Sequence, residues 1–138
     1  MLPGLFDGTT IPVLQEVLCF AQARHNVLAG NVANADTPNY QVRDLSLENF
    51  QQRLKEAISA RARQSASVSP GMLSQSDPGD AMRHVRESTK SIQFLDGSDV
   101  GIEQQVTEVA KNQFLHNLAL AIMNSQFQLL QTAISENV

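Results

Sequence analysis

Three histidines and one cysteine are the side chains of this chain best suited to metal ligation or proton transfer. The histidines are His25, His84 and His116, and the cysteine is Cys19. His25 and His116 each fall on an apolar stripe of an expected helix, so the two could face one another. Zinc needs further ligands in fixed geometry, and only Cys19 is near in sequence. We therefore predict satisfied core or interface histidines, no metal site and no cofactor.

Residue patterns typical of catalysis are absent from the sequence. The serines gather in 64–80, and neither a Gly-x-Ser-x-Gly motif nor a glycine-rich phosphate loop occurs. No pair of carboxylates sits in an apolar setting, so we predict no catalytic residue and no small-molecule substrate. Basic residues of the middle could bind a polyanion, but the acidic residues among them favour a solvated face. The basic residues are Arg61, Arg63, Arg83, His84 and Arg86, and the acidic ones are Glu56, Asp77, Asp80 and Glu87.

The composition is that of a small acidic chain. Its 138 residues normally form one domain, here 1–138, and the net charge of −4 argues against a nucleic-acid binder. A single cysteine excludes an internal disulfide, and Cys19 lies in an apolar pattern that predicts a small buried hydrophobe. Residues 1–8 carry no basic segment and no long apolar core, so we expect no cleavable secretory signal. No span is apolar enough to cross a bilayer.

Charge is distributed very unevenly along the chain. Eight of the ten Lys and Arg residues lie between Arg43 and Lys90, whereas Asn112 to Ser135 contains no charged residue. A helix of a monomeric protein normally keeps one charged face toward water. The terminal segments therefore look suited to burial on several sides, which indicates assembly with other subunits.

The residues at the two ends predict two long helices, over about 12–34 and about 99–135. Pro12 suits a first helical turn, and Ser98 or Asp99 can cap the second helix. Each helix carries a heptad seam, in which apolar positions alternate steps of four and three, and a second apolar face. At roughly 1.5 Å per residue the second helix is about 50 Å long, which is more apolar surface than this chain alone can cover. The first seam is Leu14, Leu18, Ala21, His25, Leu28 and Val32, with Val13, Val17, Phe20 and Val27 on the second face; the last seam is Ile102, Val106, Val109, Gln113, His116, Leu120, Met123, Phe127, Leu130 and Ile134, with Leu115, Leu118, Ile122 and Leu129 on its second face.

The middle region, about 41–97, is expected to be shorter and less regular. A helix over about 47–63 with Asp44 or Ser46 as its N-cap is followed by a serine-rich linker over 64–80. Ser91–Leu95 is predicted to be a short strand with Ile92 and Phe94 on one face. The fold class is therefore all-α, with two long antiparallel terminal helices in a coiled-coil-like bundle, a short third helix and an irregular middle.

A defined turn follows the first helix. Pro38 lacks an amide hydrogen and forces Thr37 out of the helical region, so the helix ends before it. Asp36, Thr37 and Asn39 can each bond neighbouring backbone groups, and Tyr40 offers a large amphipathic ring as an anchor. These features predict a tight turn of fixed geometry.

The order of residues in this segment resembles the N-terminal signature of the flagellar axial proteins, and the chain is most similar to the flagellar basal-body rod protein family. The family pattern is roughly Asn-aliphatic-Ala-Asn-x-x-Thr-x-Gly-Tyr. The chain departs from it at Asn39, where glycine is usual and where asparagine is the next best residue for a left-handed backbone. We call this segment the signature turn: Asn31, Val32, Ala33, Asn34, Thr37, Pro38, Asn39 and Tyr40.

The resemblance implies a structural subunit of the proximal rod of the bacterial flagellar basal body, which transmits torque in motility. In that family both ends pack together, line the inner tube and stay largely unfolded until polymerisation. The implied partners are copies of the chain, other rod proteins, and the inner-membrane ring and export apparatus at the rod base. Export through the flagellar type III apparatus without a cleaved signal, and a place in the periplasm-spanning rod near the inner membrane, are implied as well.

The expected mechanism is self-association. Seam residues pack within the subunit and the second faces pack on neighbours, which builds an open filament. We call the following set the assembly seam: Leu14, Leu18, Leu28, Val32, Ile102, Val106, Val109, Leu120, Met123, Phe127, Leu130 and Ile134.

Two other functions fit part of the sequence. A soluble helical adaptor or export chaperone would also be acidic and coiled-coil-like, but it should be stably helical alone, which circular dichroism of dilute protein tests. Another flagellar axial protein would share the signature turn. The short middle argues against hook and distal rod proteins, which carry large β-rich insertions.

Overall fold

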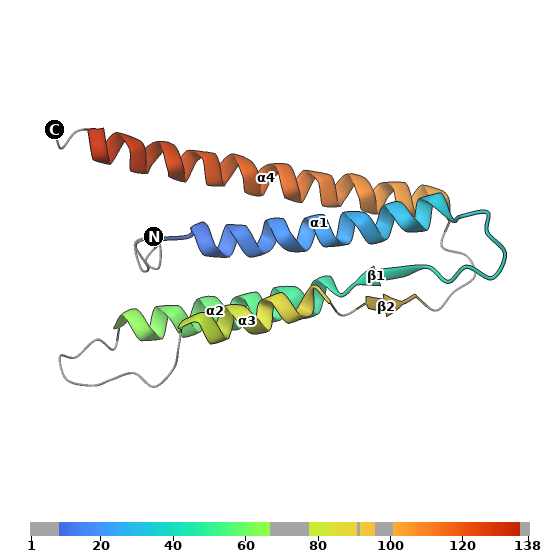
Figure 1. Ribbon diagram of the computed structural model, residues 1–138, viewed down its shortest axis with the longest axis horizontal. Coiled ribbons are helices and arrows are strands. Elements are labelled where there is room, and N and C mark those ends of the chain that lie inside the picture. Colours follow the sequence, from blue (N-terminus) through green and yellow to red (C-terminus); the bar gives the residue numbers. More distant parts are fainter. Residues whose placement is uncertain (1–8, 67–77, 91, 96–100, 136–138) are drawn as a thin grey trace.

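The computed structural model describes residues 9–66, 78–90, 92–95 and 101–135. It is elongated and layered: α4 lies along one side of α1, and the α2–α3 pair and a small sheet lie along the other (Figure 1). α1 therefore contacts every other layer. The all-α fold class is confirmed, as is the packing of two long terminal helices against each other.

The terminal helices are α1, Ile11–Ala33, and α4, Ile102–Ser135. Pro12 lies in the first turn of α1, where its missing amide hydrogen costs nothing, and Glu103 lies in the first turn of α4, near the positive end of the helix dipole. The two helices run antiparallel, and α4 continues beyond the N-terminal end of α1 (Figure 1). The proposed caps Ser98 and Asp99 lie outside the described residues.

The middle forms a helical hairpin that the sequence predicted only in part. α2 spans Leu47–Ala66, and the Ser46 hydroxyl accepts the Asn49 amide at 3.2 Å, which makes Ser46 the N-cap. α3 spans Pro78–Ser88 and was not predicted, because Pro-Gly was interpreted as a linker signal rather than as a helix start.

The predicted linker over 64–80 is therefore wrong at both ends. Residues 64–66 belong to α2 and residues 78–80 belong to α3, whereas 67–77 lie outside the described residues. α3 is held by Met82, Val85 and Ser88, which are buried at helical spacing on one face. That spacing was the sequence signal for this helix.

Two short strands join the ends of the middle region. β1, Arg43–Leu45, pairs antiparallel with β2, Ile92–Phe94, with Leu45 opposite Ile92 and Arg43 opposite Phe94. The predicted strand at 91–95 is confirmed over 92–94, while its partner β1 was not predicted. Leu45 is buried, but Ile92 and Phe94 remain exposed.

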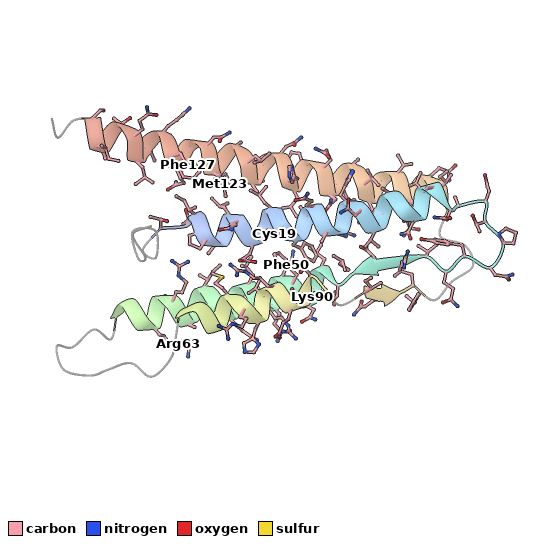
Figure 2. All side chains as sticks on the ribbon, viewed as in Figure 1. Cys19, Phe50, Arg63, Lys90, Met123 and Phe127 are labelled. Atoms are coloured by element: carbon pink, nitrogen blue, oxygen red, sulfur yellow. The ribbon has the colours of Figure 1, made fainter. Side chains whose placement is uncertain are left out.

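The apolar core lies between α1 and the α2–α3 pair. Phe20 stacks on Phe50 with ring centroids 4.0 Å apart, and the fully buried Val85 belongs to the same cluster. Figure 2 shows Phe50 between α1 and the α2–α3 pair. The second face of α1 thus packs on the chain's own middle region, so the prediction that it packs on neighbours is wrong. Its four members are Val13, Val17, Phe20 and Val27.

The predicted seam of α4 is rotated in the structure by about one residue. The buried positions are Gln105, Asn112 and Ala119, one heptad apart. Four of the ten predicted seam positions are half-buried within the subunit and face α1: Val109, His116, Met123 and Leu130. The other six are exposed, and their packing within the subunit was wrongly predicted: Ile102, Val106, Gln113, Leu120, Phe127 and Ile134.

On α1 the seam prediction holds better. Leu28 and Ala21 are buried, and Leu14, Leu18 and Val32 are half-buried. Cys19 is exposed rather than buried, because it lies on a strip of α1 that neither neighbouring layer covers.

The stacked phenylalanines provide a stability test. Phe50→Ala should lower the free energy of unfolding by about 3–5 kcal/mol, because it empties a fully packed site. Urea unfolding followed by circular dichroism measures this. The matched control is Phe114→Ala, which truncates a ring that is 70% exposed on α4 and should change stability by less than about 0.5 kcal/mol. Equal effects of the two variants would contradict the placement of the core.

Candidate functional site

The signature turn begins by capping α1. The Asn34 amide donates to the Gly30 carbonyl at 3.1 Å, and the Asn34 side-chain amide donates to the same carbonyl at 2.8 Å. The chain then folds back twice, with the Thr37 amide on the Asn34 carbonyl at 3.0 Å and the Tyr40 amide on the Thr37 carbonyl at 3.2 Å. These bonds satisfy backbone groups that the end of the helix leaves free.

Asn39 has the left-handed backbone predicted for it. Its φ is 62°, and it is the one non-glycine residue with positive φ in the part of the chain that the structure describes. Asparagine tolerates this conformation better than most residues, so it can stand where the family pattern has glycine.

Asn31 connects α1 with three other parts of the fold. Its side-chain amide donates to the Arg43 carbonyl at 2.7 Å and to Gln105 Oε1 at 2.9 Å. Its Oδ1 accepts the Arg43 amide at 3.2 Å and the Tyr40 hydroxyl at 3.3 Å. An asparagine side chain has two donor hydrogens and two acceptor positions, and here all four are used. One buried side chain therefore ties α1 to the turn, to β1 and to α4.

The two asparagines of the signature turn have different roles. Asn31 is 1% exposed and points into the structure, whereas Asn34 caps its own helix. The sequence placed both on one side of the last helical turns but did not separate the roles. Tyr40 anchors the turn as predicted, through Asn31 and through Arg43, whose guanidinium lies 6.0 Å from the ring centroid.

An ion-pair network that was not predicted from the sequence is centred on Arg24 of α1, seven residues before Asn31. Arg24 makes a two-pronged contact with Asp44, at 2.9 Å through Nε and at 2.6 Å through Nη2, and reaches Glu108 at 2.9 Å. The Arg24 side chain is 8% exposed. A buried arginine requires such partners, so a single arginine within an apolar helix was the signal that could have revealed the network.

The pKa values in this network shift as the contacts require. The hydrogen bond with Asp44 raises the pKa of Arg24 against the opposing effect of burial. The hydrogen bond with Lys111 lowers the pKa of Glu108, burial opposes it, and the bond with Arg24 adds to the lowering. Both shifts favour the charged forms of Arg24 and Glu108, and the Arg24–Asp44–Glu108 group joins β1 and α4 to α1.

The predicted meeting of His25 and His116 is present. Both line one cavity of about 240 Å³ between α1 and α4, together with Asn112. Asn112 donates to the Ala21 carbonyl at 2.7 Å, but its Oδ1 and the Nδ1 atoms of both histidines are buried without a hydrogen-bond partner. No described protein group pairs with these atoms, so the expectation of satisfied histidines stays a prediction.

Two further findings bear on site chemistry. Within the described residues, no three His, Cys, Asp or Glu side chains come close enough together to hold a metal ion. The same part of the chain contains no helix that is both long and apolar enough to span a membrane.

The basic residues of the middle region bond within the subunit. Arg86 pairs with the buried Glu16 at 2.7 Å, Arg61 donates to the Thr9 carbonyl at 3.2 Å, and Arg53 donates to the His84 carbonyl at 3.0 Å. These contacts favour the interpretation as a solvated face with structural roles over a polyanion site.

Comparison with known proteins decides the family. Residues 19–41, from Cys19 on α1 through the signature turn, match the family model described as flagella basal body rod protein. The flagellar basal body rod protein FlgB of Escherichia coli K12 is 31% identical over 83% of this chain and 84% of its own length. The chain belongs to the FlgB family of flagellar basal body rod proteins.

Other members of the FlgB family are similar along nearly the whole chain. The protein from Bacillus subtilis 168 is 29% identical over 96% of this chain and 97% of its own length, and that from Cereibacter sphaeroides is 30% identical over 86% and 88%. No solved structure matches. As a FlgB-family member the chain is a structural subunit of the proximal rod and not an enzyme, and it assembles with other rod and basal-body components.

The role of Asn31 can be tested by a substitution that exchanges only its side-chain NH2 group for an oxygen. Asn31→Asp replaces the amide donors with a carboxylate, which faces the Arg43 carbonyl and Gln105 Oε1 without hydrogens. We expect a loss of about 3 kcal/mol in unfolding free energy, measured by urea titration. Asn39→Gly is the control and should stay within about 1 kcal/mol, because glycine suits the left-handed position. Equal stability of Asn31→Asp and the parent chain would refute this role.

The lowered pKa of Glu108 gives a pH dependence. Because the folded pKa lies below the ordinary 4.5, its stabilising effect is complete above 4.5 and is lost as pH falls through the folded pKa. Glu108→Gln should therefore flatten the decline of unfolding free energy below pH 4.5. The control Glu103→Gln removes an exposed carboxylate outside the network and should keep the parent slope; identical slopes for all three chains would contradict the network.

Proposed function

We propose that this rod subunit polymerises by packing the uncovered faces of α1 and α4 against neighbouring subunits. The supporting observation is the surface of α4. Its outward face carries large apolar side chains and no charge from Asn112 to Ser135, which is unusual for a helix facing water. The exposed apolar residues are Ile102, Val106, Phe114, Leu118, Leu120, Ile122, Phe127, Leu129 and Ile134.

The uncovered strip of α1 has a different composition that also fits assembly. It is uncharged, and its members repeat at steps of four and three, so they form one continuous stripe. Small and amide side chains permit close approach of a neighbouring helix without burial of charge. The stripe consists of Gln15, Cys19, Gln22, Asn26, Ala29 and Ala33.

The assembly seam therefore divides into two groups in this proposal. The buried Leu28 and half-buried residues such as Val109 and Met123 hold the subunit together, while the exposed members of α4 contact neighbours. The neighbour-facing members are Ile102, Val106, Leu120, Phe127 and Ile134. Contacts between two different surfaces repeat without closing, and so they build a tube rather than a compact oligomer.

The family membership supports the remaining parts of the proposal. The partners are copies of this chain and other rod proteins, with the inner-membrane ring and the export apparatus at the rod base. The chain reaches the periplasm through the flagellar type III apparatus without a cleaved signal, and the assembled rod transmits torque.

The charge-free surface of α4 generates a direct test. Leu120→Asp and Phe127→Asp should each abolish swimming and rod assembly while leaving expression and helicity unchanged, because the carboxylate is solvated in the subunit and buried in the rod. Burial of an unpaired charge costs several kcal/mol. Electron microscopy of basal bodies and motility assays measure the outcome.

Gln51→Asp is the matched control, since Gln51 is exposed on α2. It adds the same charge outside the proposed interface and should leave motility intact. Normal swimming of both α4 variants would refute the proposed interface, and loss of helicity in either would move its effect from assembly to folding.

A further inference from the structure

A groove opens beside the signature turn. The turn lies at the end of the molecule opposite the start of α1 and the end of α4 (Figure 1). The groove has a volume of about 790 Å³. Its lining includes Asn34, Asn39 and Tyr40 of the turn, together with Phe94 of β2 and Ile102 of α4. We call it the turn-end groove.

Three of the residues that line the turn-end groove are large, apolar and exposed. Phe94 is 65% exposed, Ile102 is 52% exposed and Leu95 is 41% exposed. Three large apolar side chains around one concavity are more than a monomer normally leaves in water. Among the lining residues that the structure describes, Asp36 is the charged one, so an occupant of this part of the groove needs apolar surface and uncharged polar groups.

A segment of that character lies at the opposite end of the same molecule. α4 has 34 residues and α1 has 23, and the end of α4 extends past α1 (Figure 1). Leu129 is 62% exposed and Ile134 is 70% exposed there, with Phe127 also uncovered nearby (Figure 2). Between Phe127 and Ile134 the side chains other than Leu129 and Leu130 are glutamine, threonine and alanine.

We propose that the turn-end groove receives the uncharged end of a helix like α4, supplied by a neighbouring rod-family subunit. This inference rests on the proposed assembly function and names the contact. The chain's own helix end cannot fill the groove, because a helix of this length places the two about 50 Å apart. The signature turn then has a second role beyond its geometry, as part of the lining of a docking site.

Three observations carry the proposal together. The groove and the helix end both expose large apolar side chains, both are nearly free of charge, and they lie at opposite ends of one elongated subunit. A contact between opposite ends is heterologous, and it extends along an axis instead of closing. Burial of a helix end without ionised groups avoids the desolvation cost that a charged segment would incur.

The test uses Tyr40 as a reporter. It is the single tyrosine, tryptophan is absent, and its ring lines the groove. A synthetic peptide of residues 121–135, which contains neither residue, is titrated into the full chain while tyrosine fluorescence is followed. We expect a saturable change, weakened about tenfold or more by Phe94→Asp. Ile58→Asp changes an exposed apolar side chain of α2, outside the groove and the proposed assembly faces, and this variant should bind as the parent does.

The outcomes separate specific docking from general stickiness. A peptide carrying Leu129→Asp and Ile134→Asp should bind at least about tenfold more weakly. Absence of saturable binding, equal binding by Phe94→Asp and Ile58→Asp, or equal binding of both peptides would each overturn the proposal. Circular dichroism of each chain variant confirms that its helicity is retained.

A second experiment identifies the neighbour in assembled basal bodies. Phe94 is replaced by p-benzoylphenylalanine, the rods are irradiated, and the attached peptide is sequenced. The proposal requires a C-terminal helix end of a rod-family subunit, whether a second copy or a related protein. Attachment of another segment, or no product in motile cells, would overturn the groove contact while leaving the proposed rod assembly intact, since those cells have assembled rods.

Discussion

The whole arrangement depends on the four hydrogen bonds of Asn31. This side chain is almost completely buried, and it hydrogen-bonds to Tyr40, Arg43 and Gln105 at the same time. Aspartate lacks the donors, and glutamine is one methylene too long for the same space. A buried polar group that is fully satisfied fixes a unique arrangement, because any displacement leaves donors or acceptors unpaired. The signature turn therefore has its geometry imposed by one residue within it.

Two kinds of interaction hold the two sides of α1. Toward α2 and α3 the contact is an apolar core built on Phe20 and Phe50, which tolerates small shifts in register. Toward α4 the buried positions include Gln105 and Asn112, and the Arg24 network lies beside them. Each polar donor must meet a particular acceptor. These contacts therefore fix the axial position and the rotation of α4 relative to α1. They also leave the apolar side chains of α4 uncovered.

Much of the fold was predictable from the sequence, and the failures have one physical origin. Local signals succeeded: Pro38 ended the first helix, Asn39 took the left-handed backbone and Ser46 capped α2. The face of α4 that turns inward could not be predicted, because its apolar side chains surround the helix and periodicity alone selects no side. The Arg24 contact with Glu108 joins residues far apart in the chain, so local sequence patterns cannot predict it.

The polar contacts between α4 and α1 also affect the order in which the elements of the subunit unfold. The aromatic core involves α1, α2 and α3 but not α4, so α4 can peel away while that core stays intact. Its last residues, 131–135, are all exposed and open first. A partner that captures α4 in the open state therefore competes with hydrogen bonds, ion pairs and half-buried apolar side chains such as Val109 and Met123, and not with the aromatic core.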